Sequence, residues 1–396
     1  VNEPAFIQRI LESNYRNYPK SDFYQRVKPI FGEGLFELEG EHWKRKRQTV
    51  QPAFHKAQIE QMTSIMVEEI DGMLGQWVER AGQPFDVCPP LMQMTFKVIT
   101  RSISNAEIPG DMNELTDALT IIMREGERDL WALFPFLQSL PGPRHSRLKK
   151  ALKVFDDCMY ALIRERLESG AQQGDLLDML LAQKNPQTGE MVPMRELRDD
   201  LMTILIAGHE TTAMAIAWSC AMISRNPSLR HMLRAEVDTV LGGRLPTLAD
   251  LPKLEFTGMI VEEALRLYPP FWSISRKALT DDALGDYRIP AGSTLMLCPY
   301  VTHRNPRYWK NPEAFDPQRF SAGERDSRPK YAYYPFGGGP RVCLGKAFAL
   351  MEAKLYLAML TQKMALDLVL GQQLDAEPMI SLRPKGGIHM VGDLLP

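Results

Sequence analysis

The sequence has few cysteines, no long apolar run and almost no net charge. Five cysteines are scattered over 396 residues without a Cys-x-x-Cys pair, which argues against a zinc site or a disulfide framework and for a reducing compartment. No stretch approaches the roughly eighteen uninterrupted apolar residues of a membrane-spanning helix. The formal net charge of -2 gives no general polycationic character, so nucleic-acid binding is not indicated.

Hydrophobic residues make up 44% of the sequence and charged residues 24%, which is ordinary for a globular protein able to bury a large core. Helical periodicity dominates from Pro4 to about Arg225 and ends in one long helix from Pro193 onward. Between Phe271 and His303 the pattern changes to short strands. The length allows one large domain or two, and the pattern predicts a mainly helical fold with a smaller β-containing region.

A cysteine lies where the last long helix is predicted to begin, in the stretch Tyr334-Pro-Phe-Gly-Gly-Gly-Pro-Arg-Val-Cys-Leu-Gly345. The three glycines let the backbone fold tightly. A helix N-terminus offers unsatisfied N–H groups and a partial positive charge, which favour a thiolate. A stabilised thiolate suits the axial position of a haem iron, where it favours O–O cleavage. The plainer interpretation is that Cys343 is a small buried hydrophobic residue.

Three neighbours of Cys343 favour the haem interpretation. Gly345 would leave room for a macrocycle at the start of the helix. Phe336 would shield the sulfur, and Arg341 could pair with a haem propionate. A buried structural cysteine offers no common explanation for these residues and the glycines before them.

The long helix is interrupted by polar residues in the motif Ala-Gly-His-Glu-Thr-Thr, which begins at Ala207. Buried polar groups are costly unless they form hydrogen bonds or take part in function. Thr211 could donate to the carbonyl of Ala207 and loosen the helix locally, with Gly208 easing the distortion. Glu210 could then relay protons from solvent. Taken alone, a kinked helix with satisfied side chains is the better explanation, and we expect His209 to face away.

The order of Phe336, Gly339, Arg341, Cys343 and Gly345 resembles the haem-binding signature of the cytochrome P-450 family, the haem-thiolate monooxygenases, at every defined position. The Ala-Gly-His-Glu-Thr-Thr motif is similar to the family's oxygen-activation motif. The resemblance covers essentially the whole chain. It implies the cytochrome P450 fold, as one helix-rich catalytic domain over residues 1–396 whose front helix and strands are missing.

The resemblance also implies roles for individual residues. Thr211 and Glu210 would be the catalytic pair, and Cys343 would be the ligand to the metal. Arg276 would be a further propionate partner, or otherwise a surface arginine on a strand. The expected cofactor-binding residues are Cys343, Phe336, Arg341, Trp43, Arg47, Arg276, Gly345 and Ala207.

The helix that contains Trp43 resembles the family's propionate-binding helix. Trp43 and Arg47 lie four residues apart and therefore share one face, where an indole N–H and a guanidinium could clamp haem carboxylates. Lys44, Arg45 and Lys46 are expected on a solvated face. An acidic redox partner could dock against these cations.

Two more segments resemble parts of the family fold. Glu263 and Arg266, three residues apart, and Arg319 downstream are similar to the family's buried Glu-Arg-Arg triad. That role is structural, because removing one partner would leave a buried charge at a cost of roughly 3–5 kcal/mol. The apolar stretch Leu130–Leu137 would roof the substrate channel or simply pack in the core. Phe271, Trp272 and Ile274 lie where the family points residues at the substrate.

The predicted function is hydroxylation or epoxidation of an apolar small molecule by a haem b monooxygenase that uses O2 and two electrons. No Gly-x-Gly-x-x-Gly motif is present, so the electrons should come from a separate ferredoxin, flavodoxin or reductase. We expect a monomer in the cytoplasm with no nucleic-acid partner. An anchor or signal before residue 1 stays open.

Three alternatives stay open on the sequence. A peroxide-using or rearranging haem-thiolate enzyme would tend to lack the Glu210–Thr211 pair. A haem-binding sensor or carrier would not need a proton relay. A purely helical scaffold would bind no haem at all.

Overall fold

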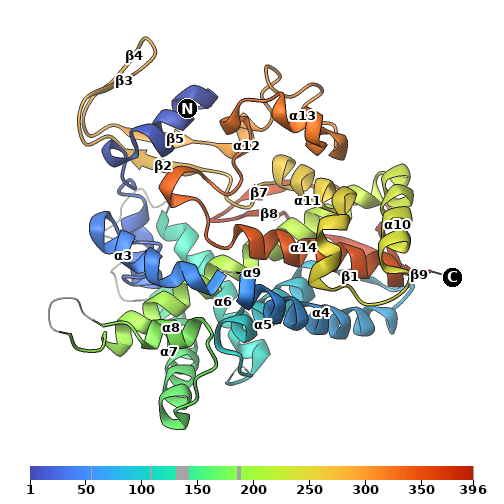
Figure 1. Ribbon diagram of the computed structural model, residues 1–396, viewed down its shortest axis with the longest axis horizontal. Helices are drawn as coiled ribbons and strands as arrows, with labels where there is room; N and C mark the ends of the chain where they lie inside the picture. Colours follow the sequence, from blue (N-terminus) through green and yellow to red (C-terminus); the bar gives the residue numbers. More distant parts are fainter. Residues whose placement is uncertain (55, 108, 131–141, 185–188, 396) are drawn as a thin grey trace. The chain divides into compact units, whose positions relative to one another are not determined.

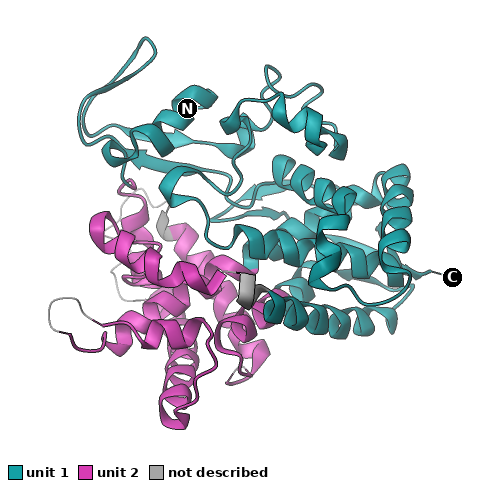
Figure 2. Ribbon diagram, viewed as in Figure 1, with its two compact units in different colours: residues 1–19, 59–94, 210–396 teal, residues 20–58, 95–209 magenta. Residues whose placement is uncertain are grey.

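The structure of the protein, a computed structural model, describes residues 1–54, 56–107, 109–130, 142–184 and 189–395. The chain forms two compact units (Figure 2). Unit 1 comprises residues 1–19, 59–94 and 210–396, and unit 2 comprises residues 20–58 and 95–209. The expectation of a single catalytic domain stays a prediction. The apolar stretch Leu130–Leu137 falls almost entirely outside the described residues.

Helices form most of unit 1 (Figure 1). Those wholly within it are α1 (Pro4–Gln8), which continues as a π-helical turn over Arg9–Ser13, α10 (Pro227–Leu241), α11 (Glu255–Leu267), α12 (Pro299–Thr302), α13 (Ala322–Asp326) and α14 (Lys346–Lys363). Three helices have residues in both units, namely α4 (Lys56–Val78), α5 (Cys88–Ser104) and α9 (Met194–Ser224). The long helix expected from Pro193 is α9.

The described strands pair in four small antiparallel groups, all in unit 1. Strand β9 (His389–Leu394) lies between β1 (Pro84–Asp86) and β6 (Met364–Leu368). The other pairs are β2 (Ile274–Lys277) with β5 (Thr294–Leu297), β3 (Asp282–Leu284) with β4 (Tyr287–Ile289), and β7 (Ala376–Pro378) with β8 (Leu382–Pro384). The β3–β4 hairpin projects from the rest of unit 1 (Figure 1).

Unit 2 is built from helices. They are α2 (Lys28–Phe31), α3 (Gly40–Val50), α6 (Met112–Leu130), α7 (Pro143–Ser169) and α8 (Leu176–Leu181), together with the parts of α5 and α9 that fall in this unit. The fold is therefore mainly helical with a small β region, as the sequence predicts.

Local signals explain where several helices begin and end. Helix α10 has Pro227 at its first position, where a missing N–H costs nothing, and ends at Gly242 in the left-handed region with a φ of 56°. Helix α8 begins after Asp175, whose carboxylate accepts a hydrogen bond from the Asp178 N–H at 3.0 Å. These boundaries fall close to those that proline, glycine and cap residues predict.

The core of unit 1 is formed largely by α14 and the second half of α9. Helix α14 is buried almost all round from Met351 to Thr361, as expected of a helix surrounded by neighbours rather than lying on a surface. The N-terminal residues Ile7, Ile10 and Leu11 pack in a second cluster with Leu297 and other residues of the β2–β5 pair. That cluster also includes Tyr331 and Tyr334, which lead into the cysteine loop.

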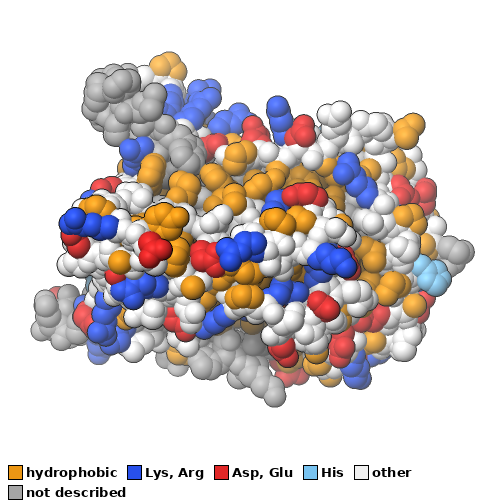
Figure 3. Space-filling model, turned by 90° about the horizontal axis from the view of Figure 1, so that it is seen from above, with side chains coloured by type: hydrophobic (Ala, Val, Ile, Leu, Met, Phe, Trp, Pro, Cys, Tyr) orange, Lys and Arg blue, Asp and Glu red, His pale blue; other side chains and the backbone are white. Residues whose placement is uncertain are grey.

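By length and composition, α9 could cross a membrane, but 78% of its most apolar window is buried inside the protein. A core helix of a globular protein has the same composition. The space-filling view shows basic, acidic and hydrophobic side chains interspersed on one face (Figure 3). That view shows no single-sign field on this face.

Candidate active site

The loop before Cys343 depends on its three glycines. Gly337 and Gly339 have φ angles of 70° and 63°, a region that other residues rarely adopt. A Cβ on Gly339 would lie 1.8 Å from the Leu11 carbonyl oxygen, and one on Gly338 would lie 2.3 Å from the Tyr331 ring. No other residue fits at these positions without moving the backbone or the tyrosine.

Cys343 lies at the end of this loop, three residues before α14 begins at Lys346. Its backbone N–H donates to the Phe336 carbonyl at 3.0 Å, which closes the loop. Gly345 is the N-cap of α14, and a Cβ there would stand 4.0 Å from the Cys343 sulfur. Residue 345 therefore lies beside the thiol, and the role of Gly345 in making room for a macrocycle stays a prediction.

Cys343 differs from the other cysteines in its exposure. All five cysteines lie among the described residues, and none forms a disulfide. Cys88, Cys158 and Cys220 are buried, and burial raises the pKa of Cys158 and of Cys220 to about 12, so both stay protonated thiols. Cys343 is exposed, so the interpretation of this residue as a small buried hydrophobic side chain is wrong.

Helix α9 presents one accessible stripe. Between Leu197 and Ile223, every residue is buried except Ile204, Ala207, Gly208 and Thr211. Their spacing of three, one and three residues places them on one face of the helix. A flat apolar group could lie against this stripe, because two of the four residues are small. Ala207 and Thr211, both predicted site residues, belong to it.

Glu210 is buried beside this stripe, with 1% of its surface exposed. Within unit 1, its Oε1 accepts hydrogen bonds from the Ser381 hydroxyl and from Arg383 Nε, the second at 2.5 Å. Sequence reasoning missed both partners, which follow 171 and 173 residues later. No local pattern links such distant positions, so no signal in one sequence could have identified them.

His209 and Gly208 lie at the end of unit 2. The buried His209 ring has Nδ1 3.0 Å from the Leu205 carbonyl and meets the Phe96 ring edge to face. A Cβ on Gly208 would lie 2.9 Å from the Ile99 side chain, so this glycine lets α5 and α9 pack closely. His209 is thus a core residue that packs against Phe96, as expected of a histidine that is no ligand.

Arg276 lies on β2 with 7% of its surface exposed. The alternative that it is a surface arginine is therefore wrong. Its Nη1 donates to the Ser275 carbonyl at 2.9 Å, and it forms no ion pair with a residue in the described ranges. A buried guanidinium needs a counter-charge, and an anionic propionate would supply one. Arg341 and Phe336, the other predicted cofactor contacts of unit 1, are half-buried.

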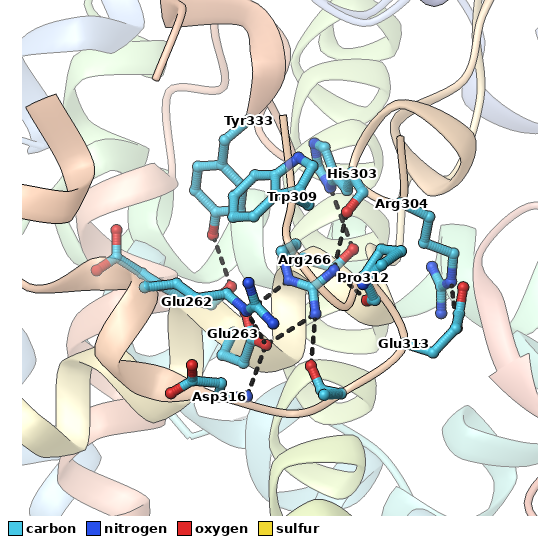
Figure 4. A network of polar contacts seen from close by, with 12 residues as sticks. Glu262, Glu263, Arg266, His303, Arg304, Trp309, Pro312, Glu313, Asp316 and Tyr333 are labelled. Atoms are coloured by element: carbon cyan, nitrogen blue, oxygen red, sulfur yellow. Dashed lines mark hydrogen bonds and ion pairs between the residues drawn. The ribbon is translucent and has the colours of Figure 1, made fainter. Parts of the chain in front are cut away.

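The Glu-Arg-Arg triad is confirmed (Figure 4). Arg266 binds Glu263 through two hydrogen bonds of 2.6 and 2.8 Å, and Arg319 Nε lies 3.4 Å from Glu263 Oε1. Arg266 also donates to three carbonyl oxygens, those of His303, Pro312 and Ala314. The triad therefore ties the end of α11 to the meander that leads to the cysteine loop.

His303, which sequence reasoning did not single out, connects the triad to that loop. Its Nε2 accepts a hydrogen bond from the Tyr334 backbone N–H at 2.9 Å, and its Nδ1 lies 3.2 Å from the Arg266 carbonyl. Burial lowers the pKa of His303 to about 3, so the ring is neutral and keeps Nε2 as an acceptor. The start of the cysteine loop is held by this ring.

In unit 2, α3 presents Trp43 and Arg47 on one face, with the guanidinium 5.7 Å from the indole centroid. Lys44 and Arg45 are exposed, as expected. The prediction for Lys46 is wrong: only 3% of its surface is exposed.

The reason is that Lys46 faces two carboxylates of α9. Its Nζ lies 2.5 Å from Glu196 Oε1 and 2.7 Å from Asp200 Oδ2. It also donates to the Gln183 side-chain oxygen at 3.1 Å. One residue of the basic run, Lys46, is therefore buried in an ion-pair network instead of exposed to solvent.

The comparisons with known proteins show the family of the chain. The family model for cytochrome P450 matches residues 1–391. The chain is 33% identical over 391 residues to cyclooctatin synthase of Streptomyces melanosporofaciens, covering 98% of this chain and 84% of that protein. It is 32% identical over 361 residues to pentalenene oxygenase of Streptomyces avermitilis, covering 91% and 80%.

A solved structure shows the same fold. The crystal structure of the cytochrome P450DA heme domain superposes with a TM-score of 0.90 at 27% identity, covering 100% of this chain and 87% of that one. The shared fold and the family model together define the class of protein. The chain belongs to the cytochrome P450 family, and it is a monooxygenase with a haem-iron cofactor that uses O2, an organic substrate and a redox partner.

Proposed function

We propose that the chain holds haem b through the Cys343 thiolate and hydroxylates or epoxidises an apolar small molecule. The observation that carries the proposal is the exposed Cys343 at the head of α14, with a glycine at residue 345 beside its sulfur. When bound, the haem iron supplies the oxygen chemistry and the thiolate supplies electron density to it. The alternative of a helical scaffold offers no reason for these features.

The protein's own residues would orient the cofactor. Arg276 and Arg341 in unit 1 and Trp43 and Arg47 in unit 2 supply N–H donors that suit propionate carboxylates. Arg276 has the strongest case, because it is buried without an ion pair among the described residues. Phe336 would shield the sulfur. The stripe that includes Ala207 offers a small-residue surface against which a flat ring could lie.

Glu210 and Thr211 would manage protons during turnover. Thr211 lies on the accessible stripe of α9, and Glu210 is the adjacent buried carboxylate. A general acid must lie within hydrogen-bond reach of its acceptor or be separated from it by one water molecule. The Thr211 hydroxyl can donate and accept at once, which suits the last position of a proton path.

The substrate would be apolar, and the electrons would come from a ferredoxin, flavodoxin or separate reductase. The name of one relative, pentalenene oxygenase, makes pentalenene the first compound to test. The exposed Lys44 and Arg45 suit an acidic electron-transfer partner. We further propose a cytoplasmic monomer.

Replacing the hydroxyl tests the proton role. The Thr211→Ala variant should keep its haem and its substrate-binding spectrum, yet release reducing equivalents as peroxide instead of product, because the donor at the end of the path is lost. The measurement is peroxide and product formed per reduced nicotinamide, with a surrogate reductase. Coupling as tight as in the wild type would contradict the role of Thr211.

A further inference from the structure

The Glu210 carboxylate is held by two residues far along the chain, Ser381 just before β8 and Arg383 on β8. Ser381 donates its hydroxyl proton to Oε1, and Arg383 Nε donates to the same oxygen at 2.5 Å. Ser381 and Glu210 are fully buried, and the Arg383 side chain is 19% exposed. A charge-assisted pair in such surroundings is shorter and stronger than one in water.

The alternation of side chains in an extended chain explains why these two residues act together. Ser381 and Arg383 are two residues apart and therefore point to the same side. Leu382 points to the other side, where it is buried, and its N–H donates to the Pro270 carbonyl at 2.9 Å. The backbone between the two donors is thus fixed by its own hydrogen bond and by core packing.

Both ends of this segment are anchored within unit 1. On one side, Trp272 Nε1 donates to the Met379 carbonyl at 2.7 Å. On the other, Asp86 Oδ1 accepts from the Ile388 N–H at 3.0 Å, and a Cβ on Gly387 would lie 2.2 Å from the Asp86 carboxylate. The two donors to Glu210 therefore stand on a rigid platform, which is what positioning a reactive group to within a fraction of an ångström requires.

The platform also connects the carboxylate to a predicted substrate contact. Pro270 and Trp272, which hold the segment in place, flank Phe271 at the start of the region expected to face the substrate. Two donors converging on Oε1 fix the orientation of the carboxyl plane as well as its place.

We propose that Arg383, assisted by Ser381, is a positioning residue that sets the orientation of the Glu210 carboxylate for proton delivery. The inference rests on the proposed function, since it takes Glu210 as the proton-relaying carboxylate. It goes beyond that function because it assigns a role to the segment around β8, for which neither the motif nor any local pattern in the sequence gives a hint.

The test uses the full-length holoprotein with Arg383→Gln, Arg383→Lys, Ser381→Ala and Glu210→Gln. Arg230→Gln is the matched control, because it breaks another partly buried arginine–carboxylate pair of unit 1, the one to Asp367. Three quantities are measured for each variant: the carbon monoxide spectrum of the reduced form, peroxide formed per reduced nicotinamide, and the solvent deuterium isotope effect on turnover. The free energy of unfolding is measured for Glu210→Gln, Arg383→Gln and the double variant.

Arg383→Gln should leave the carbon monoxide spectrum unchanged, raise the peroxide yield by about tenfold and alter the isotope effect, since small displacements of a catalytic group cost one to two orders of magnitude. Arg383→Lys should restore part of the coupling, because it keeps the charge but loses the planar fork. Ser381→Ala should raise the peroxide yield by a smaller factor. This variant replaces Arg383→Gln as the test if Arg383→Gln does not fold. The free energies of unfolding of Glu210→Gln, Arg383→Gln and the double variant form a double-mutant cycle, which should show that the two side chains are energetically coupled.

Arg383→Gln could have a normal carbon monoxide spectrum and still show the peroxide yield and the isotope effect of the wild type. That result would overturn the positioning role and leave the proposed function intact. An equal rise of the peroxide yield in Arg230→Gln would also overturn the positioning role, because any broken ion pair would then have this effect. An abnormal carbon monoxide spectrum in the wild type would instead contradict the proposed function.

Discussion

Among the described residues, two buried networks of charged side chains differ in the donors that surround their carboxylates: one lies around Glu263 in unit 1 and the other around Lys46 in unit 2. In unit 1, the Glu263 carboxylate accepts hydrogen bonds from Arg266 and from the Asp316 N–H and forms an ion pair with Arg319. Arg266 also donates to three carbonyl oxygens. In unit 2, Lys46 has three partners, but Asp200 Oδ1 is buried without a hydrogen bond to any described residue.

The pKa of each buried carboxyl group reflects this difference only in part. Burial raises the pKa of Glu263 despite its arginines, and it raises the pKa of Asp200 to about 6 despite Lys46. A single ammonium group therefore does not compensate for the desolvation of Asp200. The pKa is raised for both carboxyl groups, so neither network fully offsets the cost of burial. What differs is the set of donors: bidentate arginine and a backbone N–H around Glu263, and one lysine around Asp200.

The largest expected effect comes from breaking the network of unit 1. Arg266→Met should lower the free energy of unfolding by roughly 3–5 kcal/mol, because the buried Glu263 carboxylate would keep only the Asp316 N–H and the Arg319 guanidinium at 3.4 Å. The control Arg325→Met removes an exposed arginine from its pair with Glu262 and should cost at most about 1 kcal/mol. Urea unfolding followed by circular dichroism measures both, and equal losses would show that the burial of the network is irrelevant.

His303, also in unit 1, should make the free energy of unfolding fall at acidic pH. Its pKa lies at about 3 in the folded protein, against an ordinary value of 6.5, so its contribution to stability is complete above pH 6.5 and is lost as the pH falls toward 3. The loss should reach roughly 4 kcal/mol by pH 3.5. His303→Gln does not titrate in this window, so its stability should fall less steeply. Parallel curves for the two proteins would refute the assignment.

The contribution of Asp200 to stability should depend on pH with the opposite sign. Its pKa is raised from 3.8 to about 6, so its contribution to stability is complete below pH 3.8 and is lost as the pH rises through 6. The wild type should lose about 2–3 kcal/mol from this group over that range. The pH profile of Asp200→Asn, measured by urea unfolding, should lack this decline. An unchanged profile would mean that Lys46 compensates fully for burial.

Contiguous motifs allowed the family and the mainly helical fold to be predicted from the sequence. The glycine loop and Cys343 could be predicted because closure of that loop depends on residues within a dozen positions of one another. The predicted helix start at Cys343 was early by three residues, since α14 begins at Lys346. The triad was identified because its proline-rich surroundings resemble a known pattern.

The same reasoning failed where burial is decided by distant partners. Lys46 lies in a basic run and was expected to be solvated, yet Asp200 lies 154 residues downstream. The donors to Glu210 from β8 and its edge could not be identified either, because nothing in the composition of residues 381–383 indicates that they reach α9.

The most direct test of the central claim is the carbon monoxide spectrum of the reduced protein, compared between the wild type, Cys343→Ser and Cys298→Ser. Cys298 is a half-buried cysteine of the same unit and serves as the matched control. We expect the wild type and Cys298→Ser to show the spectrum of a thiolate-ligated haem, and Cys343→Ser to lose it. An unaltered spectrum in Cys343→Ser, or a wild-type protein without haem, would contradict the account.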